Sequence, residues 1–340
     1  MTQRDENPYR YSDSNKRYMT YDWYLKHRFG QKTARAPLDA GCTCPNLDGR
    51  RGVGGCIYCA GGSSSAHGVT IREQYDAARA VMERKWGEVA LIPYFQANTN
   101  TYGDMKRMRG LFLEAAGFEG AVMLSIATRA DSDCVTDEVT EILAECAERI
   151  PLTVEVGLQT SSDETARRIN RCHTYAEFLE GWEKLRKTAD EVNRRYDAGG
   201  GILPMKRMTL GIHVINGLPG EGRREMMKTA LDVASLSPDM VKIHLLHVMR
   251  STALEGLYAH GGYEPMTEED YVSVVCDQLE VLPPETVIGR LTGDGNADSL
   301  IAPLWSRRKT AVINDIDKEL YRRGSYQGMR YASAANTISF

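Results

Sequence analysis

Short apolar runs alternate with longer amphipathic stretches along most of this 340-residue chain. The runs are often rich in β-branched residues, which is typical of buried strands. Repeated strand–helix units predict a parallel sheet with right-handed crossovers, either doubly wound or closed toward a barrel. The expected strands lie at 34–41, 89–96, 120–128, 151–160, 207–215, 239–248 and 286–293.

The stretches between these runs predict helices, and several have a recognisable beginning. Thr136, Ser162 and Thr267 each precede two or more acidic residues, a pattern that favours the first turn of a helix. The Gly-rich stretch 197–204 is expected to be an internal loop. The expected helices lie at about 71–86, 104–116, 136–149, 163–170, 174–196, 222–236, 267–282 and 311–322.

Composition is that of a globular enzyme. With 42% hydrophobic and 26% charged residues, the chain can bury a sizeable core in one large α/β domain or two small ones. No run approaches the roughly 18 apolar residues of a membrane span, and the polar N-terminus does not resemble a secretion signal. We therefore expect a cytoplasmic protein without membrane contact. The net charge of -4 argues against a globally basic nucleic-acid binder but leaves room for a local basic patch.

Four of the eight cysteines fall within eighteen residues: Cys42, Cys44, Cys56 and Cys59. Without a secretion signal, metal ligands, reactive thiols or buried side chains explain them better than disulfides do. Eleven residues separate Cys44 from Cys56, which forms a CxxC pair with Cys59. The intervening residues are rich in Gly, Pro, Asn and Asp, so we expect a bent loop able to wrap a compact inorganic core.

Two metal centres are compatible with this loop. Three thiolates can hold three irons of a [4Fe-4S] cubane and leave the fourth iron open to a small molecule. The alternative is structural zinc, but zinc ribbons usually present two such pairs, and neither a second CxxC nor an HxxxH lies nearby. Spacing alone favours the cluster over zinc.

Several motifs in order strengthen this interpretation. The segments PLDAGCTCPNLDG, GGCIYC, EVGLQTSSDETARRINRCH, HVINGLPGE, KIHLLHV and VIGRLTGDG resemble the YhcC-type branch of the radical S-adenosylmethionine (SAM) superfamily. Relatives of that branch include the radical SAM domain of the elongator acetyltransferase and oxygen-independent coproporphyrinogen oxidase. The resemblance implies an α/β fold, a partial (β/α)6 TIM-like barrel over 35–290. A basic and aromatic extension would precede it at 1–34, and an extension closing the barrel would follow at 291–340.

The resemblance also implies the cofactors. Cys44, Cys56 and Cys59 would hold a [4Fe-4S] cluster, although the superfamily's common spacing is CxxxCxxC and the long first gap is a feature of the elongator-like and YhcC-like branches. Cys42 stands where relatives usually have an aromatic residue, so we expect it to be a spare thiol. The implied activity is reductive cleavage of SAM to a 5'-deoxyadenosyl radical, with electrons from a donor such as flavodoxin or ferredoxin.

SAM should bind at the carboxyl ends of the strands, where α/β sheets and barrels bind ligands. Gln159 and Arg171 correspond to a Gln and an Arg that contact SAM in coproporphyrinogen oxidase, and a guanidinium suits the SAM carboxylate. His213 stands where that enzyme often has Asp. The alternative is that these residues do not bind SAM. Gln159 would then be a polar strand end, Arg171 a helix terminus and His213 a buried histidine. The predicted SAM-binding residues are Gln96, Ser125, Thr128, Glu155, Gln159, Arg171 and His213.

The leading hypothesis for the substrate is tRNA, at a wobble-uridine substituent, because of the elongator-like resemblance. The run from Tyr9 to Arg35 also interleaves aromatic and basic residues, as single-stranded RNA binders do. The alternative for this run is an amphipathic helix that packs on the barrel. The alternative functions are radical chemistry on a small metabolite or cofactor precursor, and a non-catalytic zinc- or Fe-S-binding adaptor.

Overall fold

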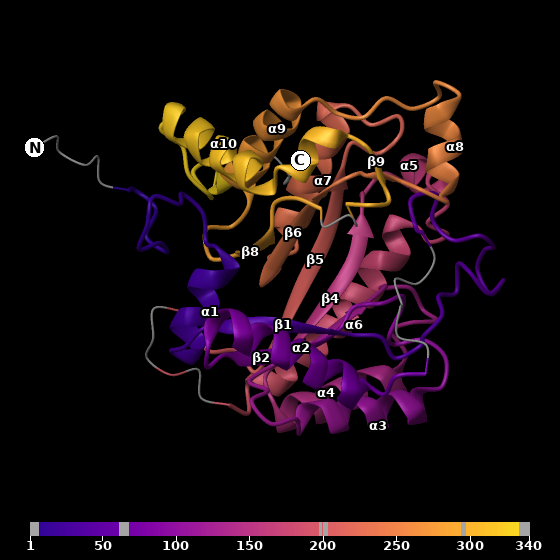
Figure 1. Ribbon diagram of the computed structural model, residues 1–340, viewed down its shortest axis with the longest axis vertical. Helices are drawn as coiled ribbons and strands as arrows, with labels where there is room; N and C mark the ends of the chain where they lie inside the picture. Colours follow the sequence, from indigo (N-terminus) through magenta and orange to yellow (C-terminus); the bar gives the residue numbers. More distant parts are fainter. Residues whose placement is uncertain (1–6, 61–67, 197–198, 200–202, 294–296, 333–340) are drawn as a thin grey trace, which may run out of the picture. The chain divides into compact units, whose positions relative to one another are not determined.

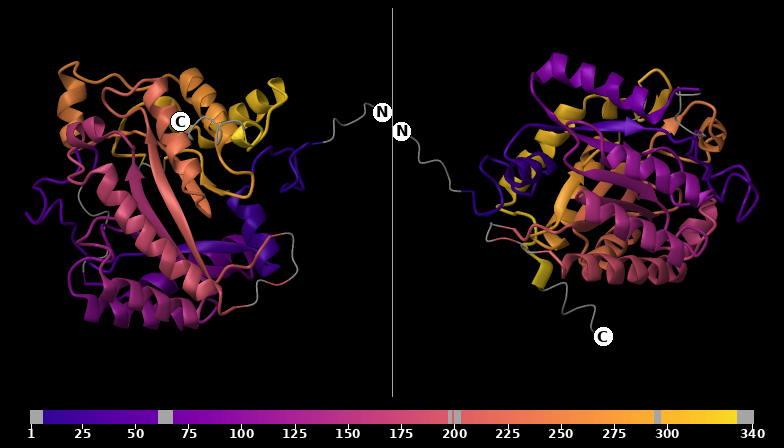
Figure 2. Two further views of the ribbon diagram at one scale, coloured as in Figure 1. Left: turned by 180° about the vertical axis from the view of Figure 1, so that it is seen from behind. Right: turned by 90° about the horizontal axis from the view of Figure 1, so that it is seen from below.

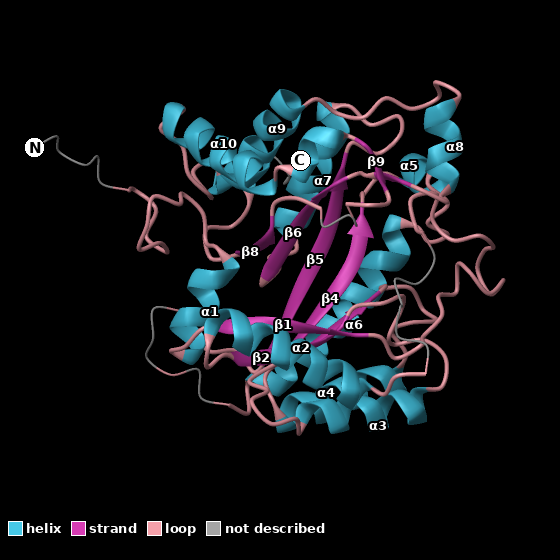
Figure 3. Ribbon diagram, viewed as in Figure 1, coloured by secondary structure: helices cyan, strands magenta, loops and turns pink. Residues whose placement is uncertain are grey.

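The computed structural model describes residues 7–60, 68–196, 199, 203–293 and 297–332. Strands and helices alternate through these ranges (Figures 1 and 3). All the predicted strands are present and form a seven-stranded sheet in the order β1-β2-β3-β4-β5-β6-β8. Their bounds are β1 (Thr33–Leu38), β2 (Ala90–Phe95), β3 (Leu124–Thr128), β4 (Leu152–Gln159), β5 (Met208–Asn216), β6 (Met240–Leu245) and β8 (Val287–Arg290).

The chain divides into two compact units. The cysteine-loop unit comprises Leu25–Leu158 and Asn170–Ile212, and the C-terminal unit comprises Met1–Tyr24, Gln159–Ile169 and His213–Phe340. In the cysteine-loop unit, β1 pairs with β2, β2 with β3 and β3 with β4, all parallel. In the C-terminal unit, β6 and β8 pair in parallel, and a short antiparallel pair that the sequence did not predict joins β7 (Val248–Met249) to β9 (Leu300–Ala302).

Helices of the cysteine-loop unit pack on one another beside its strands, whose side chains are largely buried (Figure 2). α3 packs against α4, and α4 packs against α6. Thr136 caps α4 as predicted, since its side chain accepts a hydrogen bond from the Val139 N–H. The helices are α2 (Ile71–Trp86), α3 (Met105–Ala116), α4 (Asp137–Arg149) and α6 (Tyr175–Asn193).

The C-terminal unit holds the remaining predicted helices. Ser162 and Thr267 cap α5 and α9 as predicted. The helix α8 (Ala253–Ala259) and the 3-10 turn η1 (Leu304–Arg307) were not predicted. No helix within the described ranges is long and apolar enough to cross a membrane. The predicted helices are α5 (Asp163–Arg168), α7 (Arg223–Ser235), α9 (Glu268–Val281) and α10 (Lys309–Arg322).

Four aromatic side chains of the N-terminal run are buried and are not available to stack on RNA bases. Tyr9, Tyr11, Tyr18 and Trp23 are buried. Within the C-terminal unit, the Tyr9 hydroxyl donates to the carbonyl of Pro284 at 2.7 Å, and further aromatic and ionic contacts secure the run. Stacking on bases requires exposed rings, so the expectation of an RNA-stacking surface was wrong for these four residues. These four side chains pack inside the protein instead, and only Tyr21–Phe29 of the run is helical, as α1.

Candidate functional site

The loop that follows β1 carries the clustered cysteines and is held in shape by its own main chain. The carbonyl of Cys44 accepts hydrogen bonds from Leu47 and Asp48, and the carbonyl of Pro45 accepts from Arg51 at 2.8 Å. The Cys59 N–H donates to the carbonyl of Cys56, also at 2.8 Å. We call residues 41–60 the cysteine loop.

Two asparagine side chains tie the cysteine loop to the segment before α6. The Asn46 amide, fully buried, donates to the carbonyl of Asn170. The Asn170 amide in turn donates to the carbonyls of Val53 and Gly55, at 3.1 and 2.7 Å. Asn170 adopts a left-handed conformation with φ of 55°, which asparagine tolerates better than most residues.

Gly52 marks a close approach between the same two segments. A Cβ atom at this position would lie 2.4 Å from Oδ1 of Asn46 and 2.6 Å from Sγ of Cys172. Both distances are far below van der Waals contact, so the loop admits only glycine here without moving.

The cysteine loop has N–H donors beside two of the three thiols that the resemblance assigns to a cluster. The pKa of the Cys56 thiol is raised, chiefly by burial and also by the neighbouring Cys59 and Cys44. A hydrogen bond with Tyr58 and the charge of Arg129 act in the opposite direction and lower it. The Asn46 amide lies 3.6 Å from the Cys56 sulfur, and a guanidinium of Arg129 lies 3.9 Å from that of Cys44. Hydrogen-bond donors beside sulfur stabilise thiolate ligands. In the described residues, no three His, Cys, Asp or Glu side chains are grouped to hold a metal ion.

Cys42 has different surroundings. Its sulfur contacts Sδ of Met108 at 3.4 Å, and burial raises the pKa of its thiol to about 11. Its carbonyl accepts a hydrogen bond from the Asn98 side chain. These surroundings suit a protonated thiol packed beside α3.

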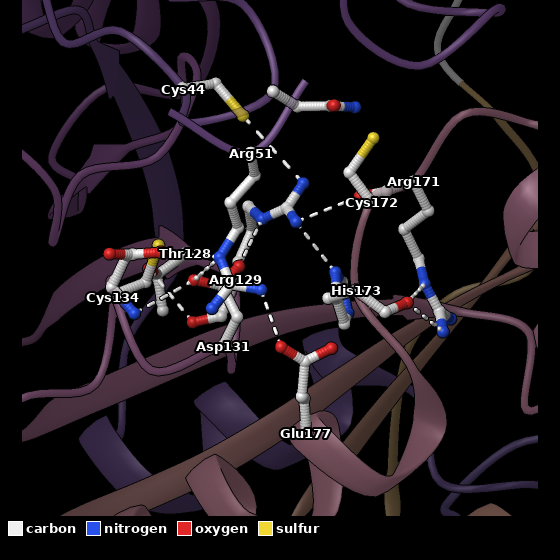
Figure 4. A network of polar contacts seen from close by, with 12 residues as sticks. Cys44, Arg51, Thr128, Arg129, Asp131, Cys134, Arg171, Cys172, His173 and Glu177 are labelled. Atoms are coloured by element: carbon white, nitrogen blue, oxygen red, sulfur yellow. Dashed lines mark hydrogen bonds and ion pairs between the residues drawn. The ribbon is translucent and has the colours of Figure 1, made fainter. Parts of the chain in front are cut away.

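A buried arginine immediately after β3 faces the cysteine loop (Figure 4). Arg129 is 8% exposed. Its Nε donates to Asp131 at 2.7 Å, and its Nη2 lies 2.9 Å from the carbonyl of Arg171 and 2.8 Å from Nδ1 of His173. Its Nη1 lies 3.9 Å from the Cys44 sulfur. The guanidinium therefore joins the cysteine loop to the segment before α6.

Asp131 links this arginine to a second one. Arg51, in the cysteine loop, lies 3.4 Å from Asp131 and forms shorter ion pairs with Asp133 at 2.5 Å and Glu177 at 2.6 Å. Asp131 is fully buried. Its charge is compensated by two guanidinium groups, as a buried carboxylate requires.

His173 completes the network as a neutral imidazole. Burial, together with the charges of Arg171 and Arg129, lowers its pKa to about 2. Because Arg129 can only donate, Nδ1 of His173 must accept, which places the ring proton on Nε2. No hydrogen-bond partner for Nε2 is found in the described part of the chain.

Arg171, predicted to bind the SAM carboxylate, is 1% exposed. Its Nη1 donates to the carbonyl of Leu158 at 2.5 Å, and Nε and Nη2 donate to the carbonyl of His173 at 3.1 and 2.9 Å. The guanidinium thus fixes the end of β4 against the segment before α6.

Three other predicted residues bind protein groups inside the cysteine-loop unit. Glu155, with no exposed surface, accepts from Ser125 at 2.9 Å and from Tyr94 at 2.8 Å, and forms an ion pair with Arg35 at 3.3 Å. Strand register places these side chains on one face of the sheet. Thr128 pairs with the hydroxyl of Thr101 at 2.5 Å. Gln96, at the end of β2, is exposed.

The last two predicted residues lie in the C-terminal unit. Gln159, half-buried at the end of β4, has a left-handed φ of 69°. The neighbouring Thr160 hydroxyl donates to Glu221 at 2.5 Å. His213, on β5, lies with its ring 5.3 Å from that of His244.

The sequence analysis missed the residues that support the cysteine loop. Thr128 was the last residue of β3 predicted to bind SAM, and Arg129 and Asp131 lie within three residues after it. A charged pair just after a buried strand is a signal that could have identified them. Asn46 was read only as a turn former. The left-handed conformation of Asn170 has no sequence signal beyond its residue type.

Comparisons with known proteins define the class. The model of the Radical SAM superfamily matches residues 48–233, and that of the Radical SAM C-terminal domain matches residues 238–327. The chain therefore belongs to the radical SAM superfamily and is an enzyme of that superfamily.

Individual relatives place it more narrowly. YtqA of Bacillus subtilis is 41% identical over 326 residues, 95% of each chain. YhcC of Escherichia coli is 29% identical over 308 residues, 88% of this chain and 91% of its own length. The structure of archaeal Elp3 from Methanocaldococcus infernus matches with a TM-score of 0.62 at 17% identity, covering 87% of this chain and 64% of that one. This likeness confirms the predicted radical SAM type of fold.

Proposed function

We propose that this enzyme cleaves SAM reductively, with Cys44, Cys56 and Cys59 holding a [4Fe-4S] cluster. When bound, such a cluster supplies the electron that breaks a carbon–sulfur bond of SAM and yields a 5'-deoxyadenosyl radical. The observation that carries the proposal is the cysteine loop, which supplies Cys44, Cys56 and Cys59 within a chain of the radical SAM superfamily.

The residues of this chain prepare the site. Main-chain hydrogen bonds and the two asparagines hold the loop in a bent conformation. Arg129 and Asn46 direct N–H groups toward Cys44 and Cys56. The carboxyl ends of β1–β4 lie at the same edge of the sheet as the loop, where SAM and a substrate would bind.

Anaerobic reconstitution with iron and sulfide tests the cluster. The wild-type protein should bind about four irons, one cubane, and show iron–sulfur absorption. With SAM and dithionite it should release 5'-deoxyadenosine. Cys44→Ala, Cys56→Ala and Cys59→Ala should each lose most of the iron, whereas the matched control Cys42→Ala should retain it. Stoichiometric zinc with no iron-sulfur absorption would contradict the proposal and favour the adaptor function.

The residues predicted from resemblance are the proposed SAM contacts, and Arg171 with Gln159 is the pair to test first. The Arg171 guanidinium also binds two main-chain carbonyls, so its loss would harm the fold as well as ligand binding. Gln159→Ala and His213→Ala are cleaner probes. Isothermal titration of SAM into the reconstituted protein should show weaker binding for both, with unchanged iron content. Wild-type affinity in both variants would remove them from the site.

The proposed substrate is tRNA, at a wobble-uridine substituent, and this part depends on the resemblance to the elongator acetyltransferase. Partial sequence similarity to Elongator complex protein 3 of mouse, 25% over 180 residues, supports it. The binding of tRNA should weaken steeply with added salt. Mass spectrometry of nucleosides from cells with and without the protein should show one altered uridine. An unchanged nucleoside profile together with no tRNA binding at low salt would instead favour a small metabolite.

A further inference from the structure

Arg129 is a buried cation whose free edge faces one of the proposed cluster ligands. The geometry points to Arg129 as a positioning residue that donates an N–H···S hydrogen bond from Nη1 to the Cys44 thiolate and raises the reduction potential of the bound cluster. This inference rests on the proposed function, because it requires the cluster to be held by Cys44.

The guanidinium has little freedom to turn away. Nε is bonded to Asp131, and Nη2 to both the Arg171 carbonyl and His173, so two of the three nitrogens are held by groups other than Cys44. The planar fork fixes Nη1 once the other two nitrogens are bound. At 3.9 Å from the Cys44 sulfur, Nη1 makes a long N–H···S contact.

His173 contributes to this orientation without adding charge. An imidazolium would repel Arg129 and have no acceptor for Nη2, whereas the neutral ring accepts from it. Asp131 supplies the counter-charge on the side of Arg129 opposite Cys44 (Figure 4). The sulfur therefore faces the positive end of a fixed Asp131–Arg129 dipole.

The direction of the effect follows from electrostatics. One-electron reduction adds a negative charge to the cluster and its thiolates. A neighbouring cation and a hydrogen bond to sulfur both stabilise that charge, so they raise the reduction potential. Burial strengthens the effect because water screens Arg129 poorly.

Three variants separate this role from a purely structural one. Arg129→Gln removes the charge and keeps an N–H donor. Asp131→Asn keeps an oxygen acceptor for Nε but removes the counter-charge. Arg50→Gln is the matched control, since Arg50 is in the same loop and also pairs with Asp133, yet its side chain is 65% exposed and its charge is screened by water.

The measurement is a redox titration with dithionite, followed by electron paramagnetic resonance, on reconstituted protein of known iron content. We expect the midpoint potential to shift downward in Arg129→Gln and upward in Asp131→Asn, and to stay at the wild-type value in Arg50→Gln. Shifts of opposite sign distinguish charge from damage to the fold, because damage has no reason to reverse direction.

The outcomes are separable. A wild-type protein that binds no cluster would overturn the proposed function itself. A loaded wild type with the same midpoint potential in Arg129→Gln would overturn only the role of Arg129. If Arg129→Gln does not bind a cluster, the role of Arg129 is tested with two other variants, Arg129→Lys and Asp131→Asn. Arg129→Lys keeps the positive charge. Arg129→Lys should remain near the wild-type value, and an unchanged or lower potential in Asp131→Asn would overturn the inference.

Discussion

Gly181 in α6 lies against the carbonyl oxygen of Ala130, so closely that a Cβ atom on Gly181 would be 2.1 Å from that oxygen. Ala130 stands between Arg129 and Asp131, the two residues that face the cysteine loop from the end of β3. The missing side chain of Gly181 therefore sets how near α6 approaches this charged pair.

We expect Gly181→Ala to destabilise the protein. The added methyl group clashes with rigid main chain, and overpacking of this kind costs about 1–3 kcal/mol. The matched control is Gly110→Ala in α3, an exposed position with no atom near the new Cβ. There alanine should stabilise the helix by about 0.5–1 kcal/mol. Urea unfolding measures both, and equal midpoints for the two variants would contradict the packing argument.

Asn170→Gly should weaken the attachment of the cysteine loop. Glycine adopts the φ of 55° without strain, so the variant removes the side-chain hydrogen bonds to Val53 and Gly55 and the contact with the Cys172 thiol. The loss should be about 1–3 kcal/mol for these two hydrogen bonds, which are not fully buried. Limited proteolysis should also cut within 41–60 sooner than in the wild type. Wild-type stability and cleavage rates would show that the loop does not depend on this residue.

His173 should make stability depend on pH below neutrality. Its folded-state pKa of about 2 lies below the ordinary value of 6.5, so the unfolded chain binds a proton that the folded protein excludes. Its contribution to stability is therefore complete above pH 6.5 and is lost as the pH falls toward 2, by at most about 1.4 kcal/mol per pH unit. His173→Asn keeps an acceptor for Arg129 but does not titrate. Between pH 7 and 5, the free energy of unfolding should fall less steeply for this variant than for the wild type. Parallel pH dependences of the two proteins would contradict the assignment.

The buried pair of Arg35 and Glu155 should behave as a coupled unit. Glu155→Gln keeps hydrogen bonding to Ser125 and Tyr94 but removes the charge with which Glu155 pairs to Arg35. Removing one partner of a buried ion pair typically costs about 3–5 kcal/mol. The double variant Arg35→Met with Glu155→Gln should lose less than the sum of the two single variants. A double-mutant cycle by urea unfolding tests this, and additive losses would show that the charges are independent.

Much of the fold was predictable because its signals are local. Each apolar run became a strand, and Thr136, Ser162 and Thr267 cap the helices that they were expected to begin. The pair β7 and β9 escaped prediction because two- and three-residue strands carry too few residues for a pattern. The prediction for the N-terminal aromatic residues was wrong because composition does not reveal whether an aromatic side chain is buried or exposed.

The candidate site was predictable only in part. Spacing and family resemblance pointed to the cysteine loop, but the partners of Arg129 come from residues 44, 131, 171 and 173. Contacts between such distant positions arise from the meeting of strand ends, which one sequence does not display. Arg171 illustrates the same gap, since its three donor nitrogens are bound to main-chain carbonyls that no motif indicates.

The cysteine loop takes its shape from Asn46, Asn170 and main-chain hydrogen bonds, none of which involves a thiol as an anchor to the rest of the unit. Oxygen attacks the inorganic core of an iron–sulfur protein before it attacks amides. Under the proposed function, these contacts would keep the shape of the loop after loss of the cluster, so that repair after oxidative stress would require new iron and sulfide and not a new polypeptide.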